Sequence, residues 1–249
     1  LVAAQSVVVD SSGQKLWVLD TGSVKSKSVG FGGPKLVAIN LSTNQVVQII
    51  FFPEDVATPT TYLNDVRFDM SRSESGIAFI TDSSAQGGLI VVDLASGESR
   101  RRLTGHPSVM SDPSFNPIVE GQPLRLRQVD EKSKPFKVGS DGIAISPDGE
   151  MLYYRSLTSR HFYSIPVDDL IDQSISDQEL ALKIHDYGQI SGASDGLESD
   201  TNGRIYLTDY EHNAIHRLYP GGDLETIMVD PRALWPDTLS LANDGYLYF

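Results

Sequence analysis

The sequence predicts an all-β fold, a β-propeller, and three observations support this. A unit that reaches a turn glycine eight positions after its first residue occurs four times, with starts at residues 5, 141, 195 and 237, and a fifth unit begins at Asp65 with three extra residues before its glycine. A short aromatic-rich run follows each glycine, and two further apolar runs joined by hairpin turns follow in most units. About four antiparallel strands per repeated unit is typical of a propeller, whereas a β-sandwich would not restart the same turn so regularly.

The runs after the glycines are predicted strands because they combine aromatic and β-branched residues and end in turn signals. They cover residues 16–19, 78–80, 152–154, 205–207 and 246–249. Asp20, Asp82 and Asp209 stand three residues after the aromatic residue of their runs, and Ser156 takes this place in the unit that starts at residue 141. A hydrogen-bonding side chain at a fixed offset predicts the same strand exit in each unit.

Residues 1–249 are predicted to form one propeller domain that is incomplete at both ends. Four whole units and the first two strands of a fifth leave an unpaired sheet edge, which a closed ring would not tolerate, so we expect a longer protein. Residues 104–138 hold five of the 13 prolines and are predicted to be an inserted loop, because proline opposes interior strands. Its basic residues are expected to form a solvated face; they are Arg125, Arg127, Lys132, Lys134 and Lys137.

Composition narrows the class of partner. The formal net charge of −13 and a pI near 4.7 remove the electrostatic drive for binding nucleic acid or an anionic membrane surface. No stretch approaches the roughly 18 apolar residues of a membrane span. The absence of cysteine excludes disulfides, thiolate metal sites and a cysteine nucleophile. A small-molecule ligand or substrate remains as the expected partner.

Four strings of the sequence resemble the major royal jelly protein/yellow family, and the match runs in order from Leu1 to Phe249. The strings are Leu-Trp-Val-Leu-Asp-Thr-Gly at 16–22, Tyr-Leu-Asn-Asp-Val at 62–66, Ile-Thr-Asp-Ser at 80–83 and Trp-Pro-Asp-Thr-Leu-Ser at 235–240. The resemblance implies a six-bladed propeller, of which this chain supplies about four and a half blades, with one blade before Leu1 and two strands after Phe249. It also implies a secreted or periplasmic protein. Extracellular animal members commonly carry disulfides, so the lack of cysteine favours a bacterial or divergent member.

The units beginning at Asp141 and Asp195 are also similar to the senescence-marker/gluconolactonase family. That resemblance implies a calcium or zinc ion at one mouth of the central channel, held by a Glu of the first blade and by Asn, Asn and Asp at later inner strands. Carried over, Asn64 matches the first Asn, Asp141 replaces the second, and Asp195 matches the Asp that also acts in catalysis. The expected Glu lies upstream of Leu1. Ca²⁺ is the expected ion.

The residues themselves support two interpretations of these positions. Side chains at the starts of innermost strands converge on a propeller axis, and hard oxygen donors gathered there are what Ca²⁺ or Mg²⁺ requires. However, Asp-Gly and Asn-Asp at strand starts are also ordinary turn chemistry, in which the side chain caps backbone amides. Asp237 starts its strand in the same way, but we expect a structural role for it within Trp-Pro-Asp-Thr.

Two functions therefore remain open at this stage. The first is a metal-dependent hydrolase of a small ester or lactone, with the ion held by Asn64, Asp141 and Asp195 and with Asp195 as general base. The alternative is a non-catalytic protein that binds an aromatic or amine ligand, or a dopachrome-type isomerase of the yellow kind. The sequence has no Gly-x-Ser-x-Gly elbow and no His-Glu-x-x-His pair, and His212 and His216 are expected to be surface residues.

Overall fold

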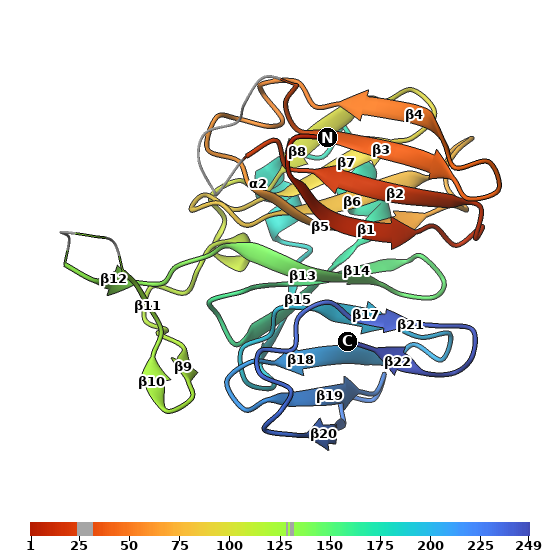
Figure 1. The fold of residues 1–249 in the computed structure, drawn as a ribbon. Helices are drawn as coiled ribbons and strands as arrows, with labels where there is room; N and C mark the ends of the chain where they lie inside the picture. The colour runs from red at the N-terminus through yellow and green to blue at the C-terminus, as the bar shows by residue number, and fades with distance from the viewer. Residues whose placement is uncertain (24–31, 128, 130–131) are drawn as a thin grey trace.

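Each complete repeat unit forms one four-stranded antiparallel sheet in the structure, a computed structural model that describes residues 1–23, 32–127, 129 and 132–249 (Figure 1). A fifth, two-stranded sheet follows at the C-terminal end. The chain is thus an all-β propeller. No helix in the described part of the chain is long and apolar enough to cross a membrane.

The four sheets use their strands in chain order, so that neighbours in sequence are neighbours in space. The first blade contains β1 (Ala4–Val9), β2 (Lys15–Asp20), β3 (Lys35–Asn40) and β4 (Gln45–Phe51), and the second contains β5 (Leu63–Asp69), β6 (Ile77–Asp82), β7 (Leu89–Asp93) and β8 (Ser99–Arg102). The third blade contains β13 (Ser140–Ile145), β14 (Met151–Ser156), β15 (His161–Pro166) and β16 (His185–Gln189), and the fourth contains β17 (Leu197–Ser199), β18 (Ile205–Asp209), β19 (Ala214–Leu218) and β20 (Leu224–Val229). The two-stranded sheet at the C-terminal end contains β21 (Ser240–Leu241) and β22 (Leu247–Tyr248).

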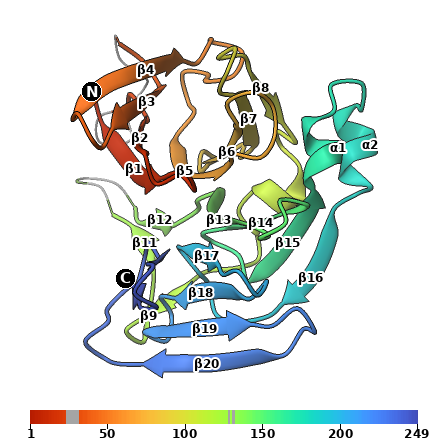
Figure 2. The same cartoon turned by 90° about the vertical axis from the view of Figure 1, so that its right-hand side faces the viewer.

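The first strand of each sheet lies nearest the axis. Successive first strands β1, β5, β13, β17 and β21 contact one another, and Figure 2 shows the sheets radiating from them. The two ends of the chain lie on the same side of this arrangement in Figures 1 and 2.

Strand pairing fixes which positions of the repeats are equivalent. In the β13–β14 pair, Asp141 lies just after the Ser140–Ser156 pairing. In the β5–β6 pair, the residue just after the equivalent Leu63–Asp82 pairing is Asn64. The starting residue that the sequence analysis gave for this unit, Asp65, was therefore wrong by one position. Asn64, the residue assigned as a ligand, therefore has the same position in its blade as Asp141 and Asp195 have in theirs.

Apolar side chains from facing sheets form the core between neighbouring blades. Trp17, Leu36 and Leu63 are completely buried in the cluster between the first and second blades. Phe162 and Leu207 are completely buried between the third and fourth blades. Trp17 and Leu207 come from runs that the sequence predicted as strands, in which alternate residues face the same neighbouring sheet.

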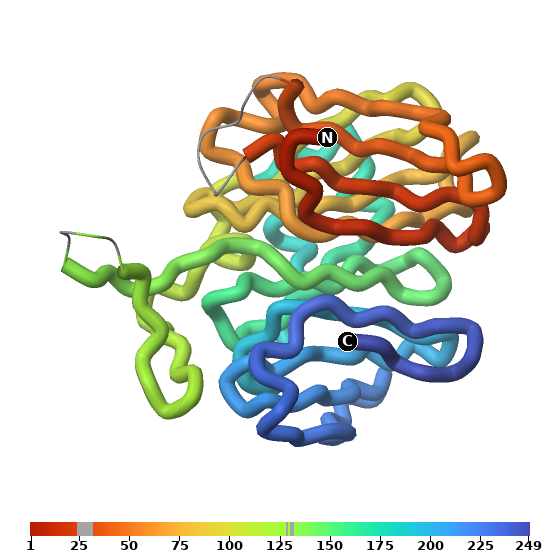
Figure 3. The backbone as a smooth tube through the Cα atoms, in the orientation of Figure 1, coloured from red at the N-terminus to blue at the C-terminus, as the bar shows by residue number. Residues whose placement is uncertain are grey.

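The segment between β8 and β13 leaves the propeller at one end of its axis, as the backbone trace shows (Figure 3). It contains a 3₁₀ turn and two short hairpins: η2 (Pro107–Val109), β9 (Ile118–Val119) with β10 (Gln122–Pro123), and β11 (Arg125–Leu126) with β12 (Lys134–Pro135). Two short helices, α1 (Val167–Ile171) and α2 (Asp177–Ala181), lie between β15 and β16. Arg125, Arg127 and Lys132 are exposed, as expected. Lys137 is an exception to the predicted solvated face, since its Nζ donates to the carbonyls of Asp112, Pro113 and Phe115.

The predicted strand-exit aspartates, at the end of the second strand of a sheet, accept hydrogen bonds from the segment that precedes the first strand of that sheet. Asp20 accepts hydrogen bonds from the backbone N–H groups of Val2 and Ala3 and pairs with Lys35 at 2.8 Å. Asp82 likewise accepts from the N–H of Tyr62 and pairs with Arg101. These buried carboxylates are satisfied by several donors, which holds the entrance of each inner strand in place.

The fourth blade uses a histidine as the basic partner of its strand-exit aspartate. Asp209 accepts from the N–H of Gly192 at 3.1 Å, and its Oδ2 lies 3.0 Å from Nε2 of His216 and 2.8 Å from Nδ1 of His212. His216 is buried, so its assignment as a surface residue was wrong. It was missed because its burial depends on pairing between β19 and β18 rather than on local pattern.

Glycine allows adjacent inner strands to approach closely at the channel mouth. A Cβ at Gly196 would lie 2.0 Å from the carbonyl oxygen of Asp237, and one at Gly142 would lie 2.6 Å from that of Asp195. Each Asp-Gly pair therefore places its glycine against the aspartate of the next blade.

This packing predicts that Gly196→Ala lowers the free energy of unfolding by about 1–3 kcal/mol, because the added methyl forces the two strands apart. Gly221→Ala is the control, since a Cβ there meets nothing within 4 Å. Urea denaturation measures both variants. Equal stability of the two would contradict the close approach of β17 and the segment before β21.

The Asp20–Lys35 pair predicts a specific acid sensitivity. Burial raises the pKa of Asp20, but hydrogen bonds from Lys35 and three backbone amides outweigh this effect and lower the pKa to about 2 from its ordinary 3.8. Because the folded-state pKa is the lower one, the carboxylate stabilises the fold above pH 4, by about 2 kcal/mol, and the contribution disappears as pH falls towards 2. Asp20→Asn should therefore be less stable than wild type at pH 7, and denaturation curves should show the difference narrowing as pH falls. A difference independent of pH would contradict this assignment.

Candidate functional site at the mouth of the channel

A cavity of about 790 Å³ opens at the end of the propeller from which the inserted segment projects. Residues at or beside the starts of all five inner strands line it, and the β11–β12 hairpin adds part of the wall. Because equivalent positions of a propeller surround one axis, a repeated polar residue becomes a ring of polar residues here.

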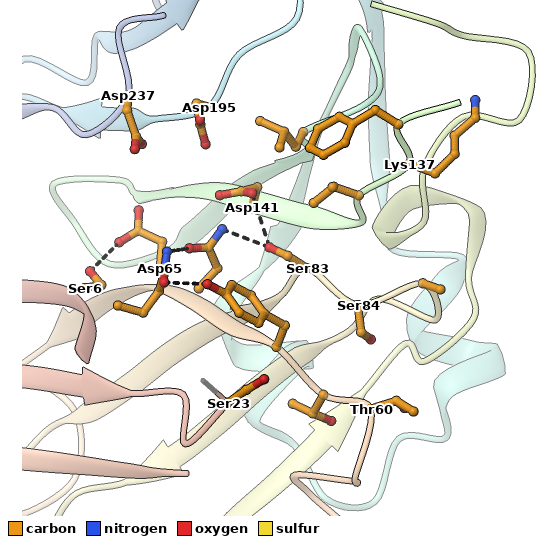
Figure 4. Close-up of a pocket in the computed structure, with 18 of the residues that line it drawn as sticks. Ser6, Ser23, Thr60, Asp65, Ser83, Ser84, Lys137, Asp141, Asp195 and Asp237 are labelled. Atoms are coloured by element: carbon orange, nitrogen blue, oxygen red, sulfur yellow. Dashed lines mark hydrogen bonds between the residues drawn. The ribbon is translucent and has the colours of Figure 1, made fainter. Parts of the chain in front are cut away.

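The three residues predicted from the sequence all line this cavity, together with two further aspartates. Asn64, Asp141 and Asp195 are joined by Asp65 and Asp237. Figure 4 shows the carboxyl groups of the four aspartates pointing toward a common space. Asp237, for which a structural role is expected, also lines the cavity.

Asp141 occupies the most enclosed position of the four. It is 4% exposed, and its Oδ2 accepts a hydrogen bond of 3.2 Å from the hydroxyl of Ser83. Burial, followed by the neighbouring charges of Asp195, Asp65 and Asp237, raises the pKa of Asp141 well above its usual range. This environment favours the protonated form of the carboxyl group.

Asp195 lies next to Asp141 and has a different set of partners. Its Oδ2 accepts a hydrogen bond of 2.5 Å from the indole Nε1 of Trp235. Burial and the charge of Asp237 raise the pKa of Asp195 to about 7, against the opposing hydrogen bonds from Trp235 and Asp141. The carboxyl groups of Asp141 and Asp195 therefore titrate as a coupled pair, in which the charge of Asp195 raises the pKa of Asp141.

The remaining two acids differ in their access to positive charge. Asp65 forms an ion pair of 3.0 Å with the buried guanidinium of Arg67, which also donates across the axis to the carbonyl of Leu197 at 2.6 Å. Partial burial and the charge of Asp65 raise the pKa of Asp237. In the described ranges no lysine, arginine or histidine lies within ion-pair distance of Asp141, Asp195 or Asp237. Three acids of the cavity thus lack a cationic partner there.

Asn64 is held by hydrogen bonds on both sides of its amide. Its Oδ1 accepts from Nε2 of Gln5 at 2.8 Å, and its Nδ2 donates to the hydroxyl of Ser83 at 2.9 Å. Ser83 in turn contacts Asp141, so a continuous polar network joins the first three blades at the cavity. The amide orientation leaves one lone pair of Oδ1 for a further contact.

Part of the cavity wall is apolar. Leu126, Pro135, Phe136 and Val138 come from the inserted segment and Leu157 from the third blade. Phe136, Val138 and Leu157 pack in one cluster with Tyr210 and Trp235. A ligand in this cavity therefore meets both carboxyl groups and hydrocarbon.

Sequence reasoning located three of these residues and missed others. Asp237 carried a usable signal, because it has the same eight-residue spacing to its glycine as Asp195. Ser83 and Trp235 had no such signal in the sequence, because their contacts with Asp141 and Asp195 join residues 58 and 40 positions apart. Asp65 was recognised as a strand start, and only pairing shows that it follows the ring position held by Asn64.

The crowding of acids predicts that removing one charge stabilises the protein when no cation is supplied. Asp141→Asn keeps a donor toward Asp195 and removes a buried carboxyl group, so at pH 8 in chelator the unfolding free energy should rise by about 1 kcal/mol. The control is Asp65→Asn, which breaks the ion pair with Arg67 and should lower stability. Thermal unfolding distinguishes the two. A decrease of similar size in both variants would contradict repulsion at Asp141.

Solved propeller structures resemble this fold over nearly the whole chain. A streptogramin B lyase matches with a TM-score of 0.58 and 16% identity, covering 100% of this chain and 62% of its own. A gluconolactonase of Xanthomonas campestris matches with a TM-score of 0.59 and 12% identity, covering 97% of this chain and 66% of its own. At these identities the likeness concerns the fold.

Curated relatives come from the honeybee, Apis mellifera. Major royal jelly protein 7 is 26% identical over 210 residues, which is 82% of this chain and 42% of the relative. Major royal jelly protein 1 is 27% identical over 172 residues, which is 66% of this chain and 37% of the relative. The chain thus spans about two fifths of the length of these relatives. The major royal jelly protein family itself matches residues 2–248. The chain belongs to the major royal jelly protein family.

Proposed function

We propose that this chain forms the active-site side of a metal-dependent hydrolase that acts on a small lactone or ester at the channel mouth. The observation that carries the proposal is the gathering of Asp141, Asp195 and Asp237, without cationic partners in the described residues, on one face of a 790 Å³ cavity. Buried carboxylates without compensation are costly, and a bound cation would offset that cost.

The residues fit a hard divalent cation by the chemistry of their donors. Carboxylate and amide oxygens are the ligands that Ca²⁺ prefers, and Asn64, Asp141 and Asp195 supply them from three successive blades. Among the described residues, no three acidic or histidine side chains already surround a single point. The amide oxygen of Asn64 and water would therefore complete the coordination. When bound, the ion would polarise the substrate carbonyl and acidify a bound water.

We assign the proton transfer of this reaction to Asp195. In the proposed reaction its carboxylate accepts the proton of a water that adds to the carbonyl carbon, and it returns that proton to the departing alkoxide oxygen as the ester bond breaks. The proton that burial favours on Asp141 in the absence of the ion would be released when its carboxylate joins the coordination shell. Phe136 and Val138 also line the cavity and would limit the access of bulk water to the substrate.

Similarity supports this proposal in two ways. One structural neighbour is a gluconolactonase, and it shares the propeller fold over 97% of this chain. The relatives are named for royal jelly, which supports a secreted or periplasmic location rather than any reaction. The negative charge of the chain supports a small-molecule partner over nucleic acid or membrane.

The presence of both acidic and apolar side chains in the cavity favours a second function. An aromatic amine could place its ammonium against Asp195 and Asp237 and its ring against Phe136 and Leu126, with no reaction or with isomerisation only. In that case an organic cation, and not a metal, would compensate the acids.

Calcium titration and turnover assays distinguish these proposals. Wild-type protein should bind Ca²⁺ in calorimetry and hydrolyse a small lactone, and Asp195→Asn should weaken Ca²⁺ binding at least tenfold and lower kcat at least a hundredfold, since it removes a ligand charge and the base. Asp148→Asn, in an exposed turn of the third blade, is the matched control and should change neither.

A fully active Asp195→Asn protein, or wild type that neither binds Ca²⁺ nor hydrolyses lactones, would end the hydrolase proposal. Binding of tyramine or dopamine by that wild type, with loss of binding in Asp195→Asn, would then support the second function.

A further inference from the structure

Trp235 has an unusual backbone conformation for a bulky residue. It lies in the segment that joins β20 to β21, and its φ is +53°. A left-handed backbone conformation is unfavourable for residues other than glycine, asparagine and aspartate. Another residue keeps this conformation only where its contacts hold it there. The contacts of the indole show what holds it.

Two contacts fix the position of this indole. The ring stacks on Tyr210, with centroids 4.3 Å apart and planes 8° from parallel. Tyr210 is completely buried and donates its hydroxyl to the carbonyl of Leu157 at 2.6 Å, so the surface beneath the indole is itself fixed. The indole N–H then points to Asp195 and donates to its Oδ2. A tryptophan N–H has no other bond to make, so the direction of the ring sets the direction of the bond.

The other tryptophan of the chain provides a comparison within the same protein. Nε1 of Trp17 donates to Oδ2 of Asp10 at 3.0 Å, which is the same type of bond. That bond joins residues seven positions apart in the first hairpin, and neither residue lines the cavity. The Trp17 bond therefore closes a turn, whereas the Trp235 bond reaches a cavity residue 40 positions away.

We propose that Trp235 is a positioning residue that fixes the carboxyl group of Asp195. Its indole donates to Oδ2, which leaves Oδ1 available for other partners of this cavity residue. The stack on Tyr210 and the strained backbone hold the indole where this bond can form. The inference deepens the function proposed above and rests on it for the consequence in catalysis, but the positioning of the carboxyl group can be measured without activity.

The direct test is nuclear magnetic resonance of the two indole N–H groups and of the Asp195 carboxyl carbon. Trp17→Phe and Trp235→Phe assign the two indole signals. Asp195→Asn should shift the Trp235 signal and leave the Trp17 signal in place, and Trp235→Phe should shift the Asp195 carboxyl resonance, whereas Trp17→Phe should not. An Asp195 resonance that is the same in wild type and Trp235→Phe would overturn the proposal whether or not the protein is a hydrolase.

The functional consequence is tested by a double-mutant cycle in Ca²⁺ affinity and kcat. Trp235→Phe keeps an aromatic ring and removes the donor, so we expect about a tenfold loss in both, while Trp235→Phe combined with Asp195→Asn should be no worse than Asp195→Asn alone. Trp17→Phe should keep wild-type values. Trp235→His restores an N–H and should recover part of the loss, and it also serves if the phenylalanine variant folds poorly. Additive losses in the double variant would show that Trp235 acts on folding rather than through Asp195.

Discussion

The close approach of neighbouring inner strands at the axis is the constraint on which the rest of the structure depends. It requires glycine directly after the aspartate in the third and fourth blades, because any Cβ at Gly142 or Gly196 would collide with the carbonyl of the next aspartate. The same packing that makes the blades meet therefore brings one aspartate beside the next. Strand-exit aspartates reinforce it by anchoring the segment before each inner strand. Backbone packing thus brings these positions together at the channel mouth, and in the third and fourth blades aspartates occupy them.

That arrangement has an electrostatic consequence which differs from blade to blade. Arg67 compensates Asp65 and bonds across the axis to the fourth blade, so one acid is neutralised within the fold. Asp141 and Asp195 instead have raised pKa values, and Ser83 and Trp235 supply hydrogen bonds to them from the neighbouring blades. In both functions proposed above, a cation would take the place of the protons that this environment favours.

Much of the fold could be predicted because propeller repeats are local: strand, glycine turn and aromatic strand recur at a fixed spacing. Asp141 and Asp195 start two of these units, whereas Asn64 was assigned through the resemblance to the gluconolactonase family. Three features could not be predicted in the same way. The one-residue error at Asp65 needed the pairing of β5 with β6, since an irregular strand start hides the register. The burial of His216 depends on its bond to Asp209 across β18 and β19. The approach of Trp235 to Asp195 depends on a left-handed backbone and an aromatic stack, neither of which has a sequence period.

The most direct test of the account is a crystal structure of the protein grown with calcium, at a resolution that shows the coordinating oxygens. The account predicts one ion on the propeller axis, about 2.3–2.6 Å from oxygens of Asp141 and Asp195, with Asn64 or water completing the shell. It also predicts that Trp235 still donates to the other oxygen of Asp195. A structure at saturating calcium in which Asp141 and Asp195 point away from each other, with no ion between them, would contradict the central claim.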